Sequence, residues 1–311
     1  TLALVAPLLL SPAPSTTAAP ILEAAETSPA PEEVSVTPEL DKLQAEILLS
    51  LRATEWPELS PTMDDAIAGG QTARDIAQCA SPDSAVDDAA CTWGDPNATK
   101  TAILVGDSTS VTYTATLRAA VGDSSGWQVK SYGTFACLFG EIEGATADDD
   151  CAVRNAQAVA AINAAKPDVV FVTNHYEGRG TGDNKMSDEA RLAAVTAEVA
   201  KITGSTSKVV FLAPPPQDVI IEECYSKVST PAQCIGGIIT QYERTRTSER
   251  NLAASIGASY VDTQQWFCVQ GQCPSFVGTT PMKRDRMHIT PAYQELIAPA
   301  VREQLIAELI F

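Results

Sequence analysis

The stretch TAILVGDSTSVTYTATLRAAV, residues 101–121, leads from an apolar run through Gly106-Asp107-Ser108 directly into a segment with helical character. Residues 102–105 favour a buried strand, and residues 111–121 favour a helix that follows at once. Gly, Asp and Ser are common turn residues, so a turn without chemistry is the default interpretation. The alternative is that Ser108 is a nucleophile at the tip of a strand, and the rest of the chain must decide between the two.

From about residue 100 the chain alternates apolar runs with helical segments. The runs cover 102–105, 127–132, 168–173, 208–212 and 258–261, and the helical segments cover 111–121, 152–165, 187–203, 238–256 and 291–309. This alternation predicts an α/β fold with a mostly parallel sheet covered by helices on both faces. In such sheets the ligand crevice lies beyond the carboxyl ends of the strands. Ser108, Asn174 and the prolines 214–216 each follow a strand directly, so we expect them at that edge.

The composition is that of a globular chain with an acidic surface. Of its 311 residues, 45% are hydrophobic and 19% are charged, enough for a sizeable core. The net charge of −18 and the lack of any basic run argue against nucleic-acid binding, because phosphate neutralisation needs clustered Lys and Arg. The arginines at 244, 246 and 250 are expected to form a solvated helix face.

The eight cysteines fall into four couples that are adjacent in sequence: Cys79 with Cys91, Cys137 with Cys151, Cys224 with Cys234, and Cys268 with Cys273. None forms Cys-x-x-Cys, and two histidines supply a zinc site poorly. An even count with each partner close by favours four local disulfides in an oxidising, extracytoplasmic compartment. The sequence alone does not fix the pairing, and eight free thiols in a cytosolic enzyme are the alternative.

The amino-terminal region reads as a leader and a linker. The apolar run of residues 1–10 is too short to span a bilayer, which takes about 20 residues. It is expected to be the end of a transmembrane helix or part of a signal peptide, and the absent Met favours a fragment of a longer membrane protein. Residues 11–38 are rich in Pro, Ala, Ser and Thr, as flexible linkers are. Residues 39–54 have helical periodicity, for a helix docked on the main domain or a juxtamembrane connector.

Two histidines are available as bases. His288 follows Asp285 by three residues, just before the last helix, so the carboxylate can reach one ring nitrogen while the other takes a proton from a hydroxyl. His175 is the competing base, and its nearest carboxylate is Glu177. Asn174, just beyond a strand, can point its amide at a developing oxyanion, although an ordinary turn Asn would look the same.

Gly106-Asp107-Ser108 after the first strand, Asn174 after the third, and Asp285-x-x-His288 before the last helix resemble the blocks of the SGNH (GDSL-like) hydrolase superfamily. The resemblance implies a three-layer, flavodoxin-like fold and acyl-ester hydrolysis or transfer without a metal or cofactor. It also implies that Ser108 is the nucleophile, His288 the base and Asp285 its orienter, with Asn174, the Ser108 N–H and Gly133 in the oxyanion hole. Two departures are Thr109, where the motif has Leu, and Val172-Thr173-Asn174-His175, where the family has Gly-x-Asn-Asp.

A narrower resemblance covers residues 55–308. CTWGDPNATKTAILVGDS (91–108), VVFLAPPPQDVIIEEC (209–224) and RDRMHITPAY (284–293) look like the extracytoplasmic SGNH domain fused behind membrane acyltransferase-3 (AT3) proteins. Fused members commonly have His-Ala where this chain has Thr109-Ser110. The resemblance implies that an AT3 domain of the same parent chain supplies an acyl group, chiefly acetyl, and that a monomeric SGNH domain places it on an envelope glycan or glycolipid.

The predicted organisation is therefore a membrane or signal segment with a linker at 1–38, a helical extension at 39–98, and a catalytic SGNH domain at 99–311. The domain would be extracytoplasmic and held at the membrane by its N-terminal segment. Two alternatives remain open at this point. One is a secreted SGNH carbohydrate esterase with the same residues, and the other is a non-catalytic binding module that kept the fold.

Overall fold

The computed structural model describes residues 37–311, except 123–124, 142–143, 145, 147–148, 177–185 and 217. The predictions for residues 1–36 lie outside the described residues. Residues 35–311 form one compact unit. Within the described ranges, no helix has both the length and the apolar character needed to cross a bilayer.

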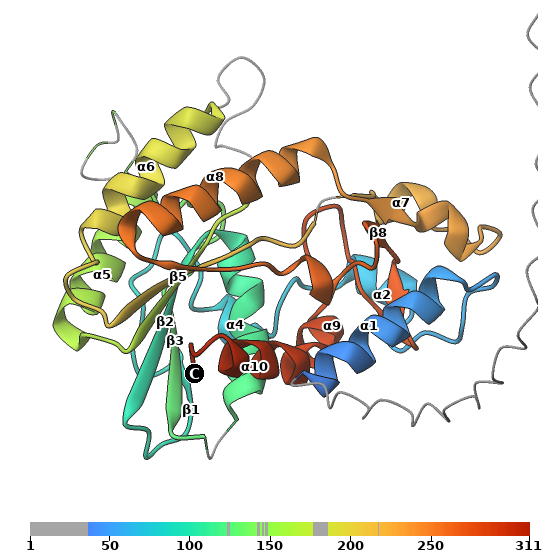
Figure 1. Cartoon of the computed structure of the whole chain (residues 1–311), viewed down its shortest axis with the longest axis horizontal. Coiled ribbons are helices and arrows are strands. Elements are labelled where there is room, and N and C mark those ends of the chain that lie inside the picture. Colours follow the sequence, from blue (N-terminus) through green and yellow to red (C-terminus); the bar gives the residue numbers. More distant parts are fainter. Residues whose placement is uncertain are drawn as a thin grey trace, which may run out of the picture. The chain divides into compact units, whose positions relative to one another are not determined.

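Six strands of the described residues form the central sheet, in the order β1-β3-β2-β4-β5-β7 (Figure 1). All neighbours are parallel except β1, which pairs antiparallel with β3 at one edge. The strands are β1 (Thr92–Gly94), β2 (Lys100–Gly106), β3 (Trp127–Ser131), β4 (Val169–Thr173), β5 (Lys208–Leu212) and β7 (Ser259–Val261).

Helices cover both faces of this sheet and complete three layers (Figure 1). One layer contains α1 (Pro38–Leu51), α4 (Ser108–Val121), α9 (Pro291–Leu296) and α10 (Ala298–Ala307), and the other contains α5 (Asp150–Ala165), α6 (Asp188–Ala200) and α8 (Thr240–Ile256). Strand β2 shows why, since Ala102 and Leu104 belong to the core beneath α4 whereas Ile103 and Val105 belong to the core beneath α5. The predicted mostly parallel, three-layer α/β fold is confirmed.

The helix expected near residues 39–54 is α1, and it docks on α10. Leu40, Leu43 and Ile47 are buried in the same core as Val301 and Leu305. The Glu303 carboxylate, also on α10, accepts hydrogen bonds from the first backbone N–H groups of α1, those of Glu39 (2.8 Å) and Leu40 (3.0 Å). These N–H groups have no partner inside the helix, so Glu303 caps it and fixes its place. The boundary proposed at residue 98 stays a prediction.

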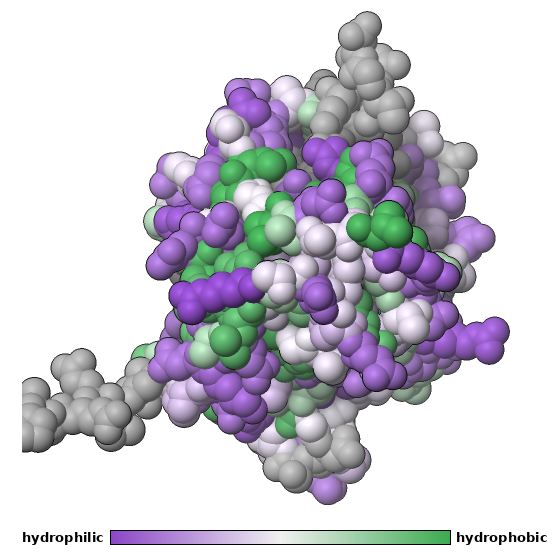
Figure 2. Space-filling view, turned by 90° about the vertical axis from the view of Figure 1, so that its right-hand side faces the viewer, coloured by the Kyte–Doolittle hydropathy of each residue, from purple (hydrophilic) through white to green (hydrophobic). Residues whose placement is uncertain are grey.

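The remaining elements are short and gather around the carboxyl ends of the strands. They are α2 (Met63–Ala68), α3 (Arg74–Ala77), α7 (Ile221–Cys224), η2 (Pro231–Cys234), β6 (Gly236–Gly237), η3 (Gln264–Trp266), β8 (Gln272–Cys273), β9 (Phe276–Val277) and β10 (Thr280–Pro281). Figure 2 shows the face that carries α1, α2 and α7, where apolar side chains lie scattered among hydrophilic ones. The single helix expected at 291–309 is two helices, because the chain turns at Ile297 between α9 and α10.

Four disulfides hold these short elements and the loops near them. They join Cys79 to Cys91, Cys137 to Cys151, Cys224 to Cys234, and Cys268 to Cys273. No cysteine is left free. Disulfides persist in oxidising compartments, so these bonds indicate an extracytoplasmic domain.

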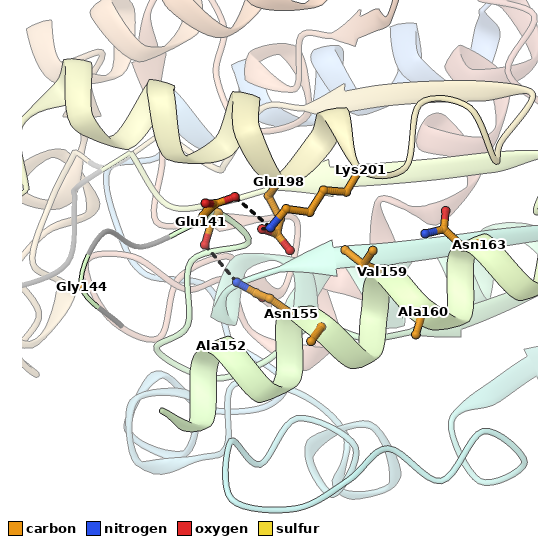
Figure 3. Close-up of a pocket in the computed structure, with 11 residues that line it drawn as sticks. Glu141, Gly144, Ala152, Asn155, Val159, Ala160, Asn163, Glu198 and Lys201 are labelled. Atoms are coloured by element: carbon orange, nitrogen blue, oxygen red, sulfur yellow. Dashed lines mark hydrogen bonds and ion pairs between the residues drawn. The ribbon is translucent and has the colours of Figure 1, made fainter. Parts of the chain in front are cut away.

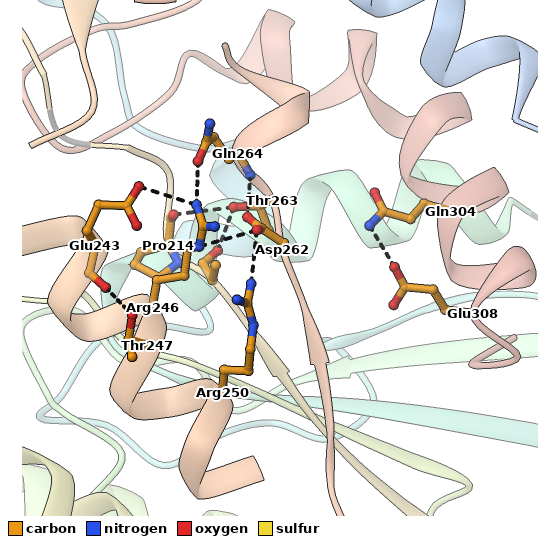
Figure 4. A network of polar contacts seen from close by, with 11 residues as sticks. Pro214, Glu243, Arg246, Thr247, Arg250, Asp262, Thr263, Gln264, Gln304 and Glu308 are labelled. Carbon is orange, nitrogen blue, oxygen red and sulfur yellow. Dashed lines mark hydrogen bonds and ion pairs between the residues drawn. The ribbon is translucent and has the colours of Figure 1, made fainter. Parts of the chain in front are cut away.

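One arginine of α8 departs from the expected solvated face. Arg244 and Arg250 are exposed, as expected, whereas Arg246 is partly buried. Arg246 and Arg250 both reach Asp262, directly after β7, at 3.4 Å and 3.2 Å (Figure 4). Because Arg246 also donates to Gln264 (2.6 Å), the two side chains tie α8 to the chain leaving the sheet. A charge pattern in sequence does not show what lies opposite a helix face.

Candidate active site

Ser108 stands at the junction of the central strand β2 and the helix α4. Asp107 caps the helix, because its Oδ1 accepts a hydrogen bond from the Thr109 N–H (2.8 Å). Gly106 precedes it with φ +142°, and a Cβ there would lie 1.7 Å from the carbonyl oxygen of Thr173. Only glycine can take this conformation so close to β4, and the resulting sharp turn presents Ser108 at the carboxyl end of the sheet.

The other carboxylate oxygen of Asp107 holds the neighbouring strand. It accepts a hydrogen bond from the His175 N–H at 2.7 Å, just past the end of β4. One buried side chain therefore fixes both the start of α4 and the backbone beside Asn174. The sequence interpretation gave Asp107 no such role, although an Asp before a helix is a recognised cap signal.

His288 and Asp285 meet Ser108 from the far end of the chain. The distance from His288 Nε2 to Ser108 Oγ is 3.0 Å, and that from His288 Nδ1 to Asp285 Oδ2 is 2.9 Å. With Nδ1–H donating to the carboxylate, Nε2 is left to accept the hydroxyl proton. The three predicted residues are thus joined by hydrogen bonds in the order Ser108, His288, Asp285. This is the geometry of a nucleophile, a base and the carboxylate that orients the base.

The carboxylate of Asp285 is held in its charged form. Its Oδ1 accepts hydrogen bonds from the backbone N–H groups of Met287 and His288, both at 2.7 Å. Burial raises the pKa of this carboxyl, but the His288 hydrogen bond, the His288 charge and the two backbone bonds lower it, and the net pKa is about 2. Asp285 is therefore an anion at neutral pH, which stabilises a protonated imidazole beside it.

The loop that carries both residues is closed and anchored. Lys283 and Ile289 form an antiparallel bridge, and the Arg284 N–H donates to the His288 carbonyl at 3.1 Å. The Lys283 ammonium is buried, bonds Asp218 Oδ1, and lies 3.2 Å from the Pro216 carbonyl oxygen. This buried pair was missed from the sequence, because nothing in the chain indicates that positions 218 and 283 meet.

Asn174 and Gly133 lie near the start of α4, in different settings. Asn174 is buried, and its side-chain amide pairs with the backbone of Phe139, whose N–H donates to Oδ1 (2.9 Å) and whose carbonyl lies 3.4 Å from Nδ2. The second Nδ2 hydrogen is free of this pairing. Gly133 packs against α4, where a Cβ would come within 2.2 Å of Ser110 Oγ, and its N–H makes a long 3.4 Å bond to Ser131 Oγ. Their oxyanion roles stay predictions.

His175 and the pair Thr109-Ser110 make other contacts than the Ser108–His288 hydrogen bond. The imidazole against Ser108 is that of His288, whereas the His175 ring stacks on Tyr176 with centroids 4.4 Å apart. Thr109 and Ser110 are both buried. The Ser110 hydroxyl donates to the Asp107 carbonyl (2.7 Å), and the Thr109 carbonyl accepts from the Thr112 hydroxyl (2.8 Å). In this chain the residues after Ser108 support the start of the helix.

A pocket of about 790 Å³ between α5 and α6 contains none of the predicted site residues (Figure 3). Its charged groups are paired, since Lys201 lies 2.8 Å from Glu198 and 2.9 Å from Glu141. Asn155 in its wall donates to the carbonyls of residues 138 and 140, at 2.9 and 3.1 Å. These bonds hold the backbone on either side of Phe139, so this wall supports Asn174 from behind. Across the described ranges, no three His, Cys, Asp or Glu residues gather as metal ligands would.

Residues 78–303 match the family described as "SGNH domain (fused to AT3 domains)". The periplasmic domain of a lipopolysaccharide acetyltransferase from Salmonella ser. Paratyphi A has a similar fold, with a TM-score of 0.53 and 15% identity over 88% of this chain and 98% of that one. An acetylxylan esterase from Geobacillus stearothermophilus gives a TM-score of 0.42, with 14% identity over 67% and 94% of the two chains. The carbohydrate acetylesterase Est24 from Sinorhizobium meliloti gives 0.41, with 13% identity over 68% and 100%.

No curated protein matches the sequence significantly. The family match covers well over half of the chain, and it includes Ser108, Asn174, Asp285 and His288. The strand–turn–helix at Ser108 and the loop that carries His288 both lie within it. The chain therefore belongs to the family of SGNH domains that are fused to AT3 domains.

Proposed function

We propose that this domain is an O-acyltransferase that carries an acyl group, chiefly acetyl, on Ser108 and passes it to a sugar hydroxyl of an envelope glycan or glycolipid. The observation that carries the proposal is the chain of hydrogen bonds that joins Ser108, His288 and Asp285, with 3.0 Å between Ser108 Oγ and His288 Nε2. A serine hydroxyl is a weak nucleophile until a base removes its proton, and this arrangement supplies that base. A non-catalytic binding module would have no need of a base hydrogen-bonded to this serine.

The reaction takes place in two halves. Ser108 Oγ attacks the acyl carbonyl carbon while its proton moves to His288 Nε2, and the resulting tetrahedral adduct expels the donor's leaving oxygen or sulfur, which takes that proton. An acyl-Ser108 ester remains. A sugar hydroxyl then gives its proton to His288 and attacks the ester carbonyl, and Ser108 leaves as it regains the proton. Water in place of the sugar gives hydrolysis.

The proposed oxyanion hole is built around the start of α4. The Ser108 N–H is the first of the helix, and no acceptor among the described residues bonds it. The partial positive charge at a helix N-terminus favours an anion there. Asn174 Nδ2 is the proposed second donor and Gly133 N–H the third. Each donor in such a hole lowers the activation barrier by about 3 kcal/mol in enzymes that use one.

The family supports a proposal for the partner. We infer that an AT3 domain of the same parent chain delivers the acyl group, and that the segment before residue 37 attaches a monomeric SGNH domain to the membrane. The fusion of family members to AT3 domains supports the first inference. The apolar run at residues 1–10 supports the second. The acetyltransferase named above, acting on lipopolysaccharide, favours acetyl and a glycolipid.

A fluorophosphonate probe tests the nucleophile on the wild-type chain and its variants. We expect the wild type to be labelled, and Ser108→Ala to take up no probe. His288→Ala should react at least about 1,000-fold more slowly, because the base is lost. His175→Ala and Ser255→Ala, the latter an exposed serine on α8, serve as controls and should keep the wild-type rate. Equal labelling of Ser108→Ala would contradict the assignment.

The acceptor is tested with p-nitrophenyl acetate, with and without added sugars. Acetylated sugar, detected by mass spectrometry, is the result expected of a transferase. Release of acetate alone, unchanged by every sugar offered, would favour the esterase alternative.

A further inference from the structure

Arg284 lies between the site and the segment that precedes the central sheet. Its guanidinium donates to Asp285 Oδ2 at 3.1 Å, and its other terminal nitrogen donates to the Ile67 carbonyl at 3.4 Å. Ile67 is in the last turn of α2, where backbone carbonyls lack partners inside the helix and a cation is favoured. A planar guanidinium presents its donors in a fixed fork, so one side chain can serve both acceptors.

The contact between Arg284 and Asp285 completes the coordination of the Asp285 carboxylate. A carboxylate accepts about four hydrogen bonds, two on each oxygen. Oδ1 takes the backbone N–H groups of Met287 and His288, and Oδ2 takes the His288 imidazole. Arg284 occupies the remaining position. The plane of the carboxylate, and with it the direction of the imidazole, is therefore set partly by the arginine.

Residues 56–72, which we call the strap, are hydrogen-bonded at several points to other parts of the domain. The Trp56 ring N–H donates to the Ser229 carbonyl (2.9 Å), and the Ser60 N–H donates to the Thr279 carbonyl (2.8 Å). At the far end, the Gln294 side chain on α9 donates to the Gln71 carbonyl at 2.6 Å. Both ends of the strap are thus fixed, and Arg284 bonds its middle.

We propose that Arg284 is a positioning residue that ties the strap to the Asp285–His288 pair. The proposal rests on the proposed function, because it assigns Arg284 a role only if His288 acts on Ser108. Docking of α2 then aligns the base through one side chain. The strap is part of the support of the active site, and a displacement of α2 changes the orientation of the His288 imidazole.

The rate of fluorophosphonate labelling tests this role in the 311-residue chain. Arg284→Met should be labelled roughly tenfold more slowly, since small misplacements of a base cost that much. Arg284→Lys retains the charge and one donor and should recover part of the loss. Arg286→Met is the matched control, because Arg286 is exposed on the same loop, and it should stay within about twofold of wild type. With p-nitrophenyl acetate, the loss should appear in kcat and leave KM unchanged.

A double-mutant cycle tests the link to the strap. Met63 anchors α2 in a small core with Ile221 and Cys234, so Met63→Ala loosens the strap without touching the loop of His288. We expect Met63→Ala to slow labelling in the wild-type background and to have no further effect beside Arg284→Met. If Arg284→Met does not fold, as judged by circular dichroism, the cycle is run with Arg284→Lys, where the effect of Met63→Ala should be reduced.

Two results would overturn the proposal. One is wild-type labelling of Arg284→Met, and the other is an undiminished effect of Met63→Ala in the Arg284 variant. A wild-type chain that takes up no probe contradicts the proposed function instead. The two failures are therefore distinguishable.

Discussion

The two halves of the candidate site are built in different ways. Ser108 is placed by regular structure, since it joins the central strand β2 to the capped helix α4 and its neighbours are fixed by strand pairing. His288 is placed by a loop that no long strand supports. The loop is held by a two-residue bridge, a buried ion pair and one hydrogen bond to the strap. Ser108 and His288 are 180 residues apart in sequence, and Ser108 Oγ lies 3.0 Å from His288 Nε2.

This difference separates two kinds of vulnerability. The nucleophile half shares its contacts with the core of the sheet, so damage there should unfold the domain. The base half depends on a few side-chain contacts, so damage there should disable the site while the sheet persists. Each prediction below tests one side of this contrast, and the largest expected effect comes first.

The largest effect is expected for Gly106→Ala on the nucleophile side. The new Cβ would meet the Thr173 carbonyl oxygen at 1.7 Å, in a backbone conformation that alanine avoids. We expect the free energy of unfolding to fall by about 4 kcal/mol, and the labelling of Ser108 to be lost together with the fold. Urea denaturation followed by circular dichroism measures this. The control is Gly204→Ala, where a Cβ meets nothing within 4 Å. If Gly106→Ala is as stable as the wild type, the contrast between the nucleophile half and the base half does not hold.

A somewhat smaller effect is expected for Lys283→Met on the base side. It leaves the Asp218 carboxylate buried without its cation, which costs about 3 kcal/mol. We expect labelling of Ser108 to fall while the circular dichroism spectrum keeps its α/β shape. Adding Asp218→Asn removes the stranded charge and should recover most of the stability. If the single variant instead loses its secondary structure below room temperature, the base half is as deeply embedded as the nucleophile half.

The smallest effect is an acid dependence of the base half. The Asp285 pKa is about 2 in the fold and about 4 in an unfolded chain. Because the folded pKa is the lower one, its stabilisation is present above about pH 4 and is lost as the pH falls through 2. The contribution is about 2 kcal/mol. The difference in unfolding free energy between wild type and Asp285→Asn should therefore shrink between pH 5 and pH 2, and a constant difference would refute this account.

The same contrast explains what could be predicted from the sequence. Strands such as 208–212 and the turn at Gly106 are local patterns, so periodicity and turn chemistry were enough to place Ser108. The residues Asp285 and His288 could be named because they are three apart and precede a helix. The groups that support their loop could not be predicted, because Asp218 and Ile67 become its partners only when distant segments fold together. The same holds for Phe139, which pairs with Asn174. Local patterns together with the family resemblance point to the groups proposed to react, and only the tertiary structure shows the groups that hold them.

The disulfides have a consequence for how such a chain matures during export. Each bond closes a span of only 5 to 14 residues, and no span overlaps another. A chain that emerges amino end first exposes its cysteines in order. If each unpaired cysteine bonds the next cysteine to appear, every bond formed is native. Oxidation in order of arrival therefore yields the correct set without reshuffling, and each pair can close before the following pair has left the translocation channel.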